Sequence, residues 1–464
     1  MRNILFLVCL LISQVFYSQT ENLSVLSLQE FLGYVKAYHP IVRQANLVID
    51  ESEAYLMKAR GGFDPKIEVD FAKKEFKSTD YYEKLNAAFK IPTWYGIELK
   101  ASYEENQGVY LNPENVTPEE GLYNLGISVA LAQNLFINPR MATLKQAKLY
   151  ESQAKEDRQL LVNNILFEAS LVYFDWLKTY HEKLVYESFL ENATMRFKGV
   201  KRSFETGESP AIDTLEAGIT LKDRKLNLEQ ARINFVKKTY ELSNYLWLND
   251  DTPVELREGI FPDILTIETV DLAFNVSAFA TATFELEEHP KMRSLDFKYR
   301  GLEVEKRLMA NKLLPVIDFE YNFLSETPRE FDSYDTYNYK SGLFVAIPLF
   351  LRKERGDLKL AKLKLQNTQF EIDNTRVSIQ NKIKVIEQEI ASYEVQDNLT
   401  QDIVKDYASM LDAEERKFTL GESSLFLVNS RESKLIDAKL KGIDLQNKYF
   451  TAKAKLFNAL GLVI

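Results

Sequence analysis

Two alternating hydrophobic patterns divide the chain into helical and strand-like segments. In the segment 379–390, the residues Ile379, Ile383, Ile386 and Ile390 step by four, three and four, a heptad stripe typical of a coiled-coil seam. At 1.5 Å per residue, the two longest helical stretches would each reach about 95 Å, which favours long paired helices over a small globular core. Apolar positions recur with a helical period in residues 28–60, 141–204, 211–248, 272–312, 357–420 and 425–460.

Segments with a two-residue period lie between the helical stretches. Apolar and polar residues alternate after Pro65 and after Pro315, and again in residues 85–101, 123–131 and 343–347. Such alternation predicts half-buried β-strands. A strand of a soluble sandwich would show the same pattern. The polar positions carry Lys, Glu, Asp, Asn and Ser, however, which suits the water-filled lumen of a membrane barrel.

The two strand-bearing segments differ in length. Pro65 and Phe136 are 71 residues apart, whereas Pro315 and Phe350 are 35 residues apart, so the first segment is 36 residues longer. Residues 85–91 and 95–101 are candidate strands for an additional hairpin, which would bring the chain above four strands. An elaborated external loop would account for the excess equally well, and both interpretations stay open.

The sequence also contains the same structural plan twice. Residues 136–248 align with 350–462 at a constant offset of 214 without an insertion, as paired helices require, because one added residue rotates a helix face by about 100°. His39-Pro40 and His289-Pro290 are related by an offset of 250. The domain organisation expected from this duplication is a signal peptide (1–18), repeat 1 (19–249, with a strand insertion at 65–135), a linker (250–271) and repeat 2 (272–464, with a strand insertion at 315–349).

The start of the chain resembles an export signal, with Arg2 followed by an apolar run at 4–12 that is too short to span a bilayer. The only cysteine, Cys9, lies inside that run, so we expect neither disulfides nor thiolate chemistry in the mature protein. No later segment offers about 20 consecutive apolar residues, which argues against a membrane-spanning helix. The net charge of −10 argues against nucleic acid as a partner.

Catalytic motifs are absent from the sequence. The three histidines are His39, His181 and His289, and two of them precede a proline at equivalent repeat positions, which indicates a structural role. No Ser/His/Asp set, no Cys/His spacing typical of metal sites and no glycine-rich phosphate loop is present. We therefore expect a protein that is not an enzyme and uses no cofactor and no metal.

The doubled helix–proline–strand units at 59–65 and 310–315, together with the doubled helical turns at Gly207 and Gly421, resemble the TolC family of outer-membrane efflux ducts. The resemblance covers essentially the whole chain after the signal peptide. It implies a mainly α fold with membrane β: duplicated long helical hairpins form an α-barrel in the periplasm, and strands of three chains close one transmembrane β-barrel. It also implies a homotrimer in outer-membrane lipid that serves tripartite efflux or type I secretion as a passive exit duct.

In that family the helical turns meet a periplasmic adaptor (membrane fusion) protein and, through or beside it, an inner-membrane pump. Gly and Ser also end and restart helices, so a purely structural role accounts for the same residues. The matching positions here are Gly207, Glu208, Ser209, Gly421, Glu422, Ser423 and Ser424.

The family closes its tunnel with acidic residues six and nine positions after the glycine of a helical turn (the tip glycine). In repeat 1 these positions are Asp213 and Glu216, a possible tunnel constriction. Repeat 2, where the family places its gate, has Leu427 and Ser430 instead, so this chain departs from the pattern. That Asp213 and Glu216 are merely solvated helix residues stays an open alternative.

Two other functions fit parts of the sequence. A periplasmic coiled-coil adaptor or scaffold of an envelope assembly would explain the helical hairpins but not the alternating segments between them. A soluble exported binding protein would remain monomeric and would not conduct ions. No pattern in the sequence identifies the exported substrate, the particular adaptor and pump, or the trigger that opens the tunnel.

Overall fold

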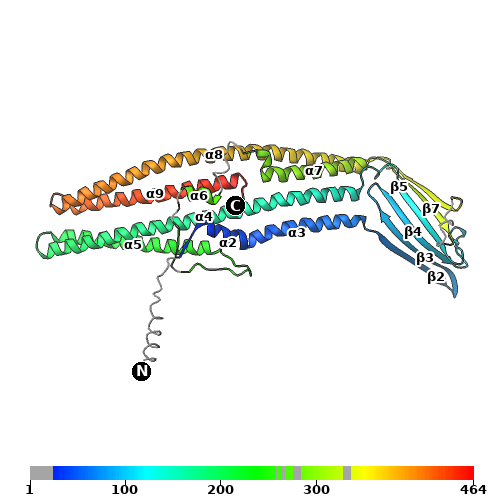
Figure 1. The fold of residues 1–464 in the computed structure, drawn as a ribbon, viewed down its shortest axis with the longest axis horizontal. Helices are drawn as coiled ribbons and strands as arrows, with labels where there is room; N and C mark the ends of the chain where they lie inside the picture. Colours follow the sequence, from blue (N-terminus) through cyan, green and yellow to red (C-terminus); the bar gives the residue numbers. More distant parts are fainter. Residues whose placement is uncertain are drawn as a thin grey trace, which may run out of the picture. The chain divides into compact units, whose positions relative to one another are not determined.

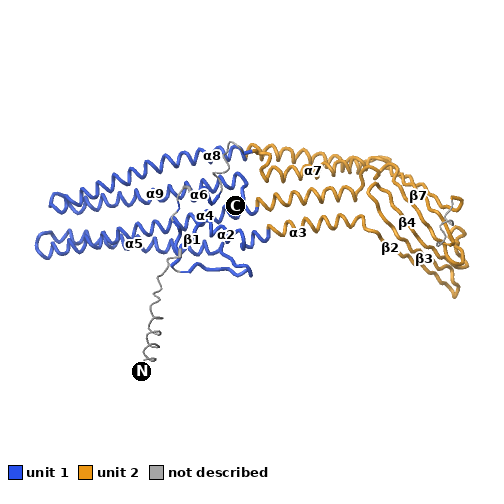
Figure 2. The backbone as a smooth tube through the Cα atoms, in the orientation of Figure 1, with its two compact units in different colours: residues 1–44, 161–284, 379–464 blue, residues 45–160, 285–378 orange. Residues whose placement is uncertain are grey.

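The structure is a computed structural model that describes residues 24–257, 259–263, 265, 267–274, 284–327 and 336–463. It divides into two compact units (Figure 2): unit 1 takes the described parts of 1–44, 161–284 and 379–464, and unit 2 takes those of 45–160 and 285–378. The expected signal peptide and Cys9 lie outside the described residues. Both units draw on both predicted repeats, and the repeat and linker boundaries stay a prediction.

Most of the chain is helical, and two helices are far longer than the rest (Figure 1). The long stretches predicted from periodicity are found within a few residues of their expected ends. The helices are α2 (Leu28–Tyr38), α3 (Pro40–Arg60), α4 (Pro139–Glu205), α5 (Ala211–Ser243), α6 (Ile267–Phe274), α7 (Pro290–Asn311), α8 (Arg352–Thr419) and α9 (Leu425–Ala459).

Two helix predictions were wrong in detail, and a His-Pro pair explains both. The predicted helix 28–60 is divided into α2 and α3. Of the predicted helix 272–312, residues 272–274 are the end of α6, residues 275–283 lie outside the described part, and a separate helix, α7, begins at Pro290. A residue before proline avoids the α region because it would clash with the proline ring. His39 (φ −65°, ψ 134°) and His289 (φ −62°, ψ 130°) are accordingly extended.

Each of these histidines also caps the helix that follows it. The Nδ1 atom of His289 accepts the Lys291 N–H at 3.0 Å, and that of His39 accepts the Ile41 N–H at 3.3 Å. Both side chains are buried. Burial lowers the pKa of His39, which favours the neutral imidazole that such an acceptor requires. The duplicated His-Pro pair thus has the same local geometry in both halves of the sequence.

The core of unit 1 is built from aromatic rings contributed by helices that are distant in sequence. Phe174 of α4 lies 5.5 Å from Phe450 of α9, and Phe274 of α6 lies 5.1 Å from Phe457, both between ring centroids. Trp176 is fully buried, and its indole N–H donates to the Thr239 hydroxyl of α5 at 2.9 Å. These contacts join α4, α5, α6 and α9 around one interior.

A short parallel pair, β1 (Ser24–Leu26) and β6 (Ile260–Pro262), is attached to this core. The buried Tyr173 hydroxyl donates to the Leu26 carbonyl at 2.7 Å and accepts the Asp263 N–H at 3.3 Å. Burial raises the pKa of Tyr173, so the phenol stays protonated and can donate.

Among the described helices, one stretch of α4 is long and apolar enough to cross a membrane by length and composition. However, 56% of that stretch is buried inside the structure, and α4 carries the buried Tyr173, Phe174 and Trp176. We therefore assign it to the core of unit 1.

In unit 2, four helical segments lead into a six-stranded sheet. Leu56 and Ala59 of α3 pack against Ala147 of α4, and Lys298 of α7 pairs with Glu371 of α8 at 2.8 Å. The strands follow the helices directly after Pro65 and Pro315. They are β2 (Lys66–Phe76), β3 (Thr79–Pro92), β4 (Ile97–Gln107), β5 (Leu122–Ala130), β7 (Val316–Ser325) and β8 (Tyr339–Ala346).

All neighbours in the sheet are antiparallel, in the order β2-β3-β4-β5-β7-β8 (Figure 1). The 36-residue excess of the first strand-bearing segment is the hairpin β3–β4, which lies inside the sheet. Residues 74–82 form the tight end of the β2–β3 hairpin, where Lys77 (φ 51°) and Ser78 (φ 58°) have the left-handed geometry of a two-residue turn.

Candidate functional site: the helical turns and the two faces of the sheet

The first helical turn connects α4 to α5. Gly207 has φ 83°, a left-handed conformation that L residues rarely adopt, and its N–H donates to the Phe204 carbonyl at 3.0 Å. The N–H groups of Glu208 and Ser209 both reach the Ser203 carbonyl, at 2.8 and 3.2 Å. The N–H groups of the turn thus satisfy carbonyl groups at the end of α4. Gly207 and Glu208 remain exposed.

The second turn connects α8 to α9 and has the same backbone geometry. Gly421 has φ 76°, and the Glu422 N–H donates to the Lys417 carbonyl at 2.9 Å. Its side chains differ from those of the first turn. The Ser424 hydroxyl caps α9 by accepting the Leu427 N–H, and the Ser423 hydroxyl donates to Glu414 at 2.6 Å.

Both turns belong to unit 1 and lie at the same end of it (Figure 1). Val200 of α4, Ala217 of α5 and Leu425 of α9 form one small buried cluster there. The structure therefore brings the seven predicted docking residues to one end of the unit. Nothing in this arrangement tests the docking role, which stays a prediction.

Sequence reasoning missed the apolar side chains that surround these turns. Leu420 is 73% exposed, Phe426 67% and Ile212 64%. Each lies within five residues of a tip glycine. An apolar residue next to a Gly-Glu-Ser turn was the available signal, because a turn that needed only to be soluble would be polar throughout.

The two candidate constriction residues lie near the start of α5. Asp213 is in the first turn of that helix, and Glu216 accepts a hydrogen bond from the Asn429 side chain of α9 at 3.1 Å. Both are half-buried. Glu216 thus connects the two hairpins of the same chain, and the constriction role of this pair stays a prediction.

The sheet of unit 2 has one apolar and one polar face. Because side chains alternate along a strand and the register is antiparallel throughout, neighbours across the sheet share a face. One row of paired residues on the apolar face runs Ile67, Phe89, Ala101, Leu125, Phe323 and Tyr339. The adjacent row on the polar face runs Lys66, Lys90, Lys100, Gly126, Asn322 and Lys340.

The apolar face is exposed in the described part of unit 2. Ile67 is 77% exposed, and Val69 and Leu343 are each 64% exposed. Toward the β2–β3 turn, this face ends at an ion pair between Lys73 and Glu83, 3.4 Å apart. A contiguous exposed apolar surface of this kind marks a contact with lipid or with another protein.

Two lysines of the polar face are paired with carboxylates. Lys90 lies 2.6 Å from Glu68, and Lys100 lies 3.5 Å from Glu320. A depression of about 170 Å³ lies on this face between β4, β5, β7 and β8. The polar face is therefore built for contact with water.

Comparisons with known proteins address the fold. No protein-family model and no curated protein sequence matches this chain. Solved structures match it over nearly its whole length. CusC, studied for conformational changes accompanying folding and transmembrane channel formation, has a TM-score of 0.67 at 12% identity and covers 93% of this chain and 91% of its own.

The outer membrane protein VceC of Vibrio cholerae has a TM-score of 0.66 at 12% identity, covering 94% of this chain and 96% of its own. The CmeC outer membrane channel of Campylobacter jejuni has a TM-score of 0.64 at 13% identity, covering 94% and 85%. The chain is TolC-like in fold. The expected fold class, duplicated long helical hairpins combined with a strand set, is thereby confirmed.

In this TolC-like fold, a buried charge cluster near the turns also escaped the sequence analysis. Glu432 of α9 is fully buried between two arginines: Arg224 Nε of α5 at 3.2 Å and Arg196 Nη1 of α4 at 2.7 Å. Arg196 also pairs with Glu415 of α8 at 2.7 Å. The cluster joins all four long helices of unit 1.

The sequence did contain a signal for this cluster. Leu425, Val428, Glu432 and Leu435 step by three, four and three residues, and all four are buried. A carboxylate in such an apolar stripe requires buried cationic partners, because an isolated charge is strongly disfavoured in a protein interior. Glu432 therefore had to face an arginine or lysine on a neighbouring helix.

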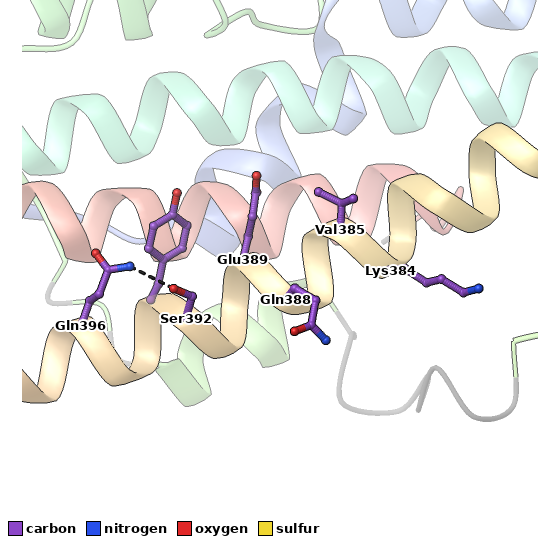
Figure 3. A pocket seen from close by; sticks show the side chains of 7 residues that line it. Lys384, Val385, Gln388, Glu389, Ser392 and Gln396 are labelled. Atoms are coloured by element: carbon purple, nitrogen blue, oxygen red, sulfur yellow. Dashed lines mark hydrogen bonds between the residues drawn. The ribbon is translucent and has the colours of Figure 1, made fainter.

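One depression on the helices belongs to α8 alone. Figure 3 shows this depression, of about 540 Å³, whose lining side chains all come from this single helix. Gln396 donates to Ser392 there at 3.0 Å, and Glu389 pairs with Lys455 of α9 at 3.3 Å. Among the residues that the structure describes, no group of three or more His, Cys, Asp or Glu side chains is arranged to hold a metal ion.

Proposed function

We propose that this chain is one subunit of a passive exit duct in the outer membrane of the cell. The observation that carries this proposal is the six-stranded sheet with an uncovered apolar face opposite a charged, hydrated face. In water the uncovered face would be strongly unfavourable, whereas in a bilayer it meets hydrocarbon. Strands of 8 to 14 residues are comparable with the roughly 9–11 residues of a tilted membrane-spanning strand.

The edges of the sheet support assembly from several copies. Main-chain N–H and C=O groups along the outer edges of β2 and β8 lack strand partners within the described chain. Such groups are costly in lipid, so a spanning sheet must close on itself. Because six alternating strands place β2 and β8 in opposite directions, β8 of one copy and β2 of the next can pair antiparallel. Repeating that pairing around an axis closes a barrel, and we propose three copies.

The helical hairpins then extend into the periplasm as an α-barrel tunnel that ends at the two turns. There we propose that Gly207, Glu208, Ser209, Gly421, Glu422, Ser423 and Ser424 meet a periplasmic adaptor, with an inner-membrane pump supplying the energy. The exposed Leu420 and Phe426 offer apolar contact area beside these polar residues. Asp213 and Glu216 are proposed to narrow the tunnel near this end. The duct itself carries out no reaction and uses no cofactor.

The oligomeric mass and ionic conductance of the full-length protein test the duct. Purified from membranes in detergent, it should have the mass of three chains and form steady channels in a planar bilayer. Val69→Lys is the informative variant, because it places a charge on the apolar face without touching the helices. A monomer that does not enter bilayers would overturn the proposal and favour a periplasmic scaffold.

Adaptor docking is tested separately from conduction. Leu420→Glu changes an exposed residue beside the second turn and should leave trimer mass and bilayer conductance unchanged while reducing export from cells. Leu399→Glu, at another exposed position on α8, serves as the matched control. Equal export by the two variants would contradict docking at the turns.

A further inference from the structure

The two strand-bearing segments contribute unequally to the sheet. Residues 66–130 supply four strands and residues 316–346 supply two. The extra hairpin, β3–β4, lies between β2 and β5 rather than at an edge. β3 pairs with β2, and β4 pairs with β5, along most of their length, for example at Ile67↔Phe89 and at Leu99↔Ile127. The hairpin is therefore an integral part of the sheet.

The faces of this hairpin are in phase with those of its neighbours. Ala87 of β3 lies between Val69 and Tyr103 on the apolar face, while the next residue back, Asn86, lies between Asp70 and Glu104 on the polar face. A loop projecting from the wall into water would not need a continuous apolar face. The alternation indicates that β3 and β4 separate lipid from lumen as the other four strands do.

The β4–β5 connection is also fastened to the end of this hairpin. The Asn106 N–H donates to the Thr117 hydroxyl at 3.0 Å, and the Asn106 side chain donates to the Asn115 carbonyl at 2.9 Å. The Tyr110 N–H donates to the Tyr81 carbonyl of β3 at 3.0 Å. These bonds hold β3 and β4 in place at the end away from the helices.

We infer that three copies close an eighteen-stranded barrel with a lumen wide enough for bulky hydrophilic cargo. This inference rests on the proposed duct. Strands about 4.8 Å apart and tilted by about 40° give eighteen strands a backbone diameter of about 36 Å. Without β3–β4, three copies would supply twelve strands and a diameter of about 24 Å. Side chains occupy about 5 Å on the inner side, so the eighteen-stranded lumen is about 26 Å wide.

Charges on the polar face balance, which suits a hydrated wall without strong attraction for one sign of charge. Its lysines are Lys66, Lys74, Lys84, Lys90, Lys100 and Lys340, and its carboxylates are Glu68, Asp70, Glu98, Glu104, Asp318 and Glu320. Size rather than charge should therefore limit what passes this part of the duct.

Spin labels at adjacent residues test whether β3 belongs to the wall. In a Cys9→Ser background, Ala87→Cys and Asn86→Cys each provide one attachment site, and the labelled trimers are placed in lipid vesicles. The Ala87 label should collide with dissolved oxygen and be shielded from a water-soluble nickel complex, and the Asn86 label should show the reverse. Equal access of the nickel complex to both labels would place the hairpin outside the wall and overturn the inference.

Removal of the hairpin tests the width directly. Deleting residues 79–121 joins Ser78 to Leu122, keeps the Lys77-Ser78 turn and pairs β2 with β5 so that Phe71 faces Ile127 on the apolar side. Electron microscopy of detergent-solubilised trimers should show the barrel narrowing from about 36 Å to about 24 Å, with the helices unchanged. An intact protein that already measures about 24 Å would overturn the inference while leaving the duct in place. An intact protein that is not trimeric would instead contradict the duct, and its mass shows this before any diameter is measured.

Discussion

The two compact units place their large apolar side chains in opposite ways. In unit 1, Phe174, Trp176 and Phe450 are almost completely buried, and each contacts a helix distant in sequence. In the sheet of unit 2, Ile67, Val69 and Leu343 are largely exposed on one continuous face. Helices can surround an interior within one chain, whereas an open sheet has two faces and can leave one of them to its surroundings.

This difference separates fold stability from assembly. Removing an interior group of unit 1 should destabilise the single chain, because the contact is complete within it. Changing an apolar residue on the sheet should leave the single chain folded and alter only its insertion into a membrane.

The largest effect is expected from the buried charge cluster of unit 1. Glu432→Ala leaves Arg224 and Arg196 without their shared carboxylate in a buried position, which should cost about 3–5 kcal/mol of unfolding free energy. Chemical unfolding in detergent, followed by helical circular dichroism, measures this loss. Glu415→Ala is the matched control: it removes a partly exposed partner of Arg196 and should cost less than about 1 kcal/mol. Equal losses in the two variants would show that burial does not set the strength of this cluster.

The second effect concerns the apolar face of the sheet. Val69→Lys should cost about 2–4 kcal/mol of membrane insertion free energy, because it places a charge on the lipid side. Asp70→Lys, the next residue on β2, places the same charge on the polar face and should insert normally. The fraction of protein recovered in outer-membrane trimers measures both variants, and unfolding of the helices should be unaffected in both. Normal insertion of Val69→Lys would mean that this face does not meet lipid.

A smaller effect is expected at the glycines of α4 and its turn. Gly207 has φ 83° and open space on the side where an added methyl group would lie, so Gly207→Ala should cost about 1–2 kcal/mol through backbone strain alone. Gly199 lies in the helix interior with open space around it, and Gly199→Ala should stabilise by about 0.5–1 kcal/mol. Thermal unfolding compares the two, and shifts of the same sign would contradict the assigned backbone geometry.

The sequence allowed the long helices and the strands to be predicted because both have clear periodicity. It predicted less well wherever one local feature interrupts a pattern. Pro40 divides one predicted helix, and a new helix begins at Pro290 within another, although the apolar spacing continues through both positions. The additional hairpin could not be decided either, because alternation describes a strand in the wall and one in an external loop equally well.

The sequence also could not identify which helix packs against an apolar stripe. The heptad stripe of α8 is typical of a coiled-coil seam, which leaves open whether its partner belongs to the same chain. Ile383 and Ile386 are in fact buried within the single chain, and Glu394 of the same helix accepts a hydrogen bond from Tyr449 of α9 at 3.1 Å. Periodicity determines which face of a helix is buried, and only the tertiary structure identifies the element that packs against that face.

The smallest effect is a pH dependence of unit 1. Burial lowers the pKa of His39 below its ordinary value of 6.5, even though the carboxylate of Glu168 acts in the opposite direction. Because the folded pKa is lower than the unfolded one, the stabilisation is complete above pH 6.5 and is lost as pH falls through 6.5 toward the folded value. His39→Asn does not titrate but can still accept the Ile41 N–H, so it should reduce the loss of stability between about pH 8 and pH 5.5. His181, whose pKa is also lowered by burial, remains in the variant and preserves part of the slope. Other titrating groups are common to both proteins, so the difference between their unfolding curves isolates His39. Parallel curves would mean that the cap at the start of α3 survives protonation of its histidine.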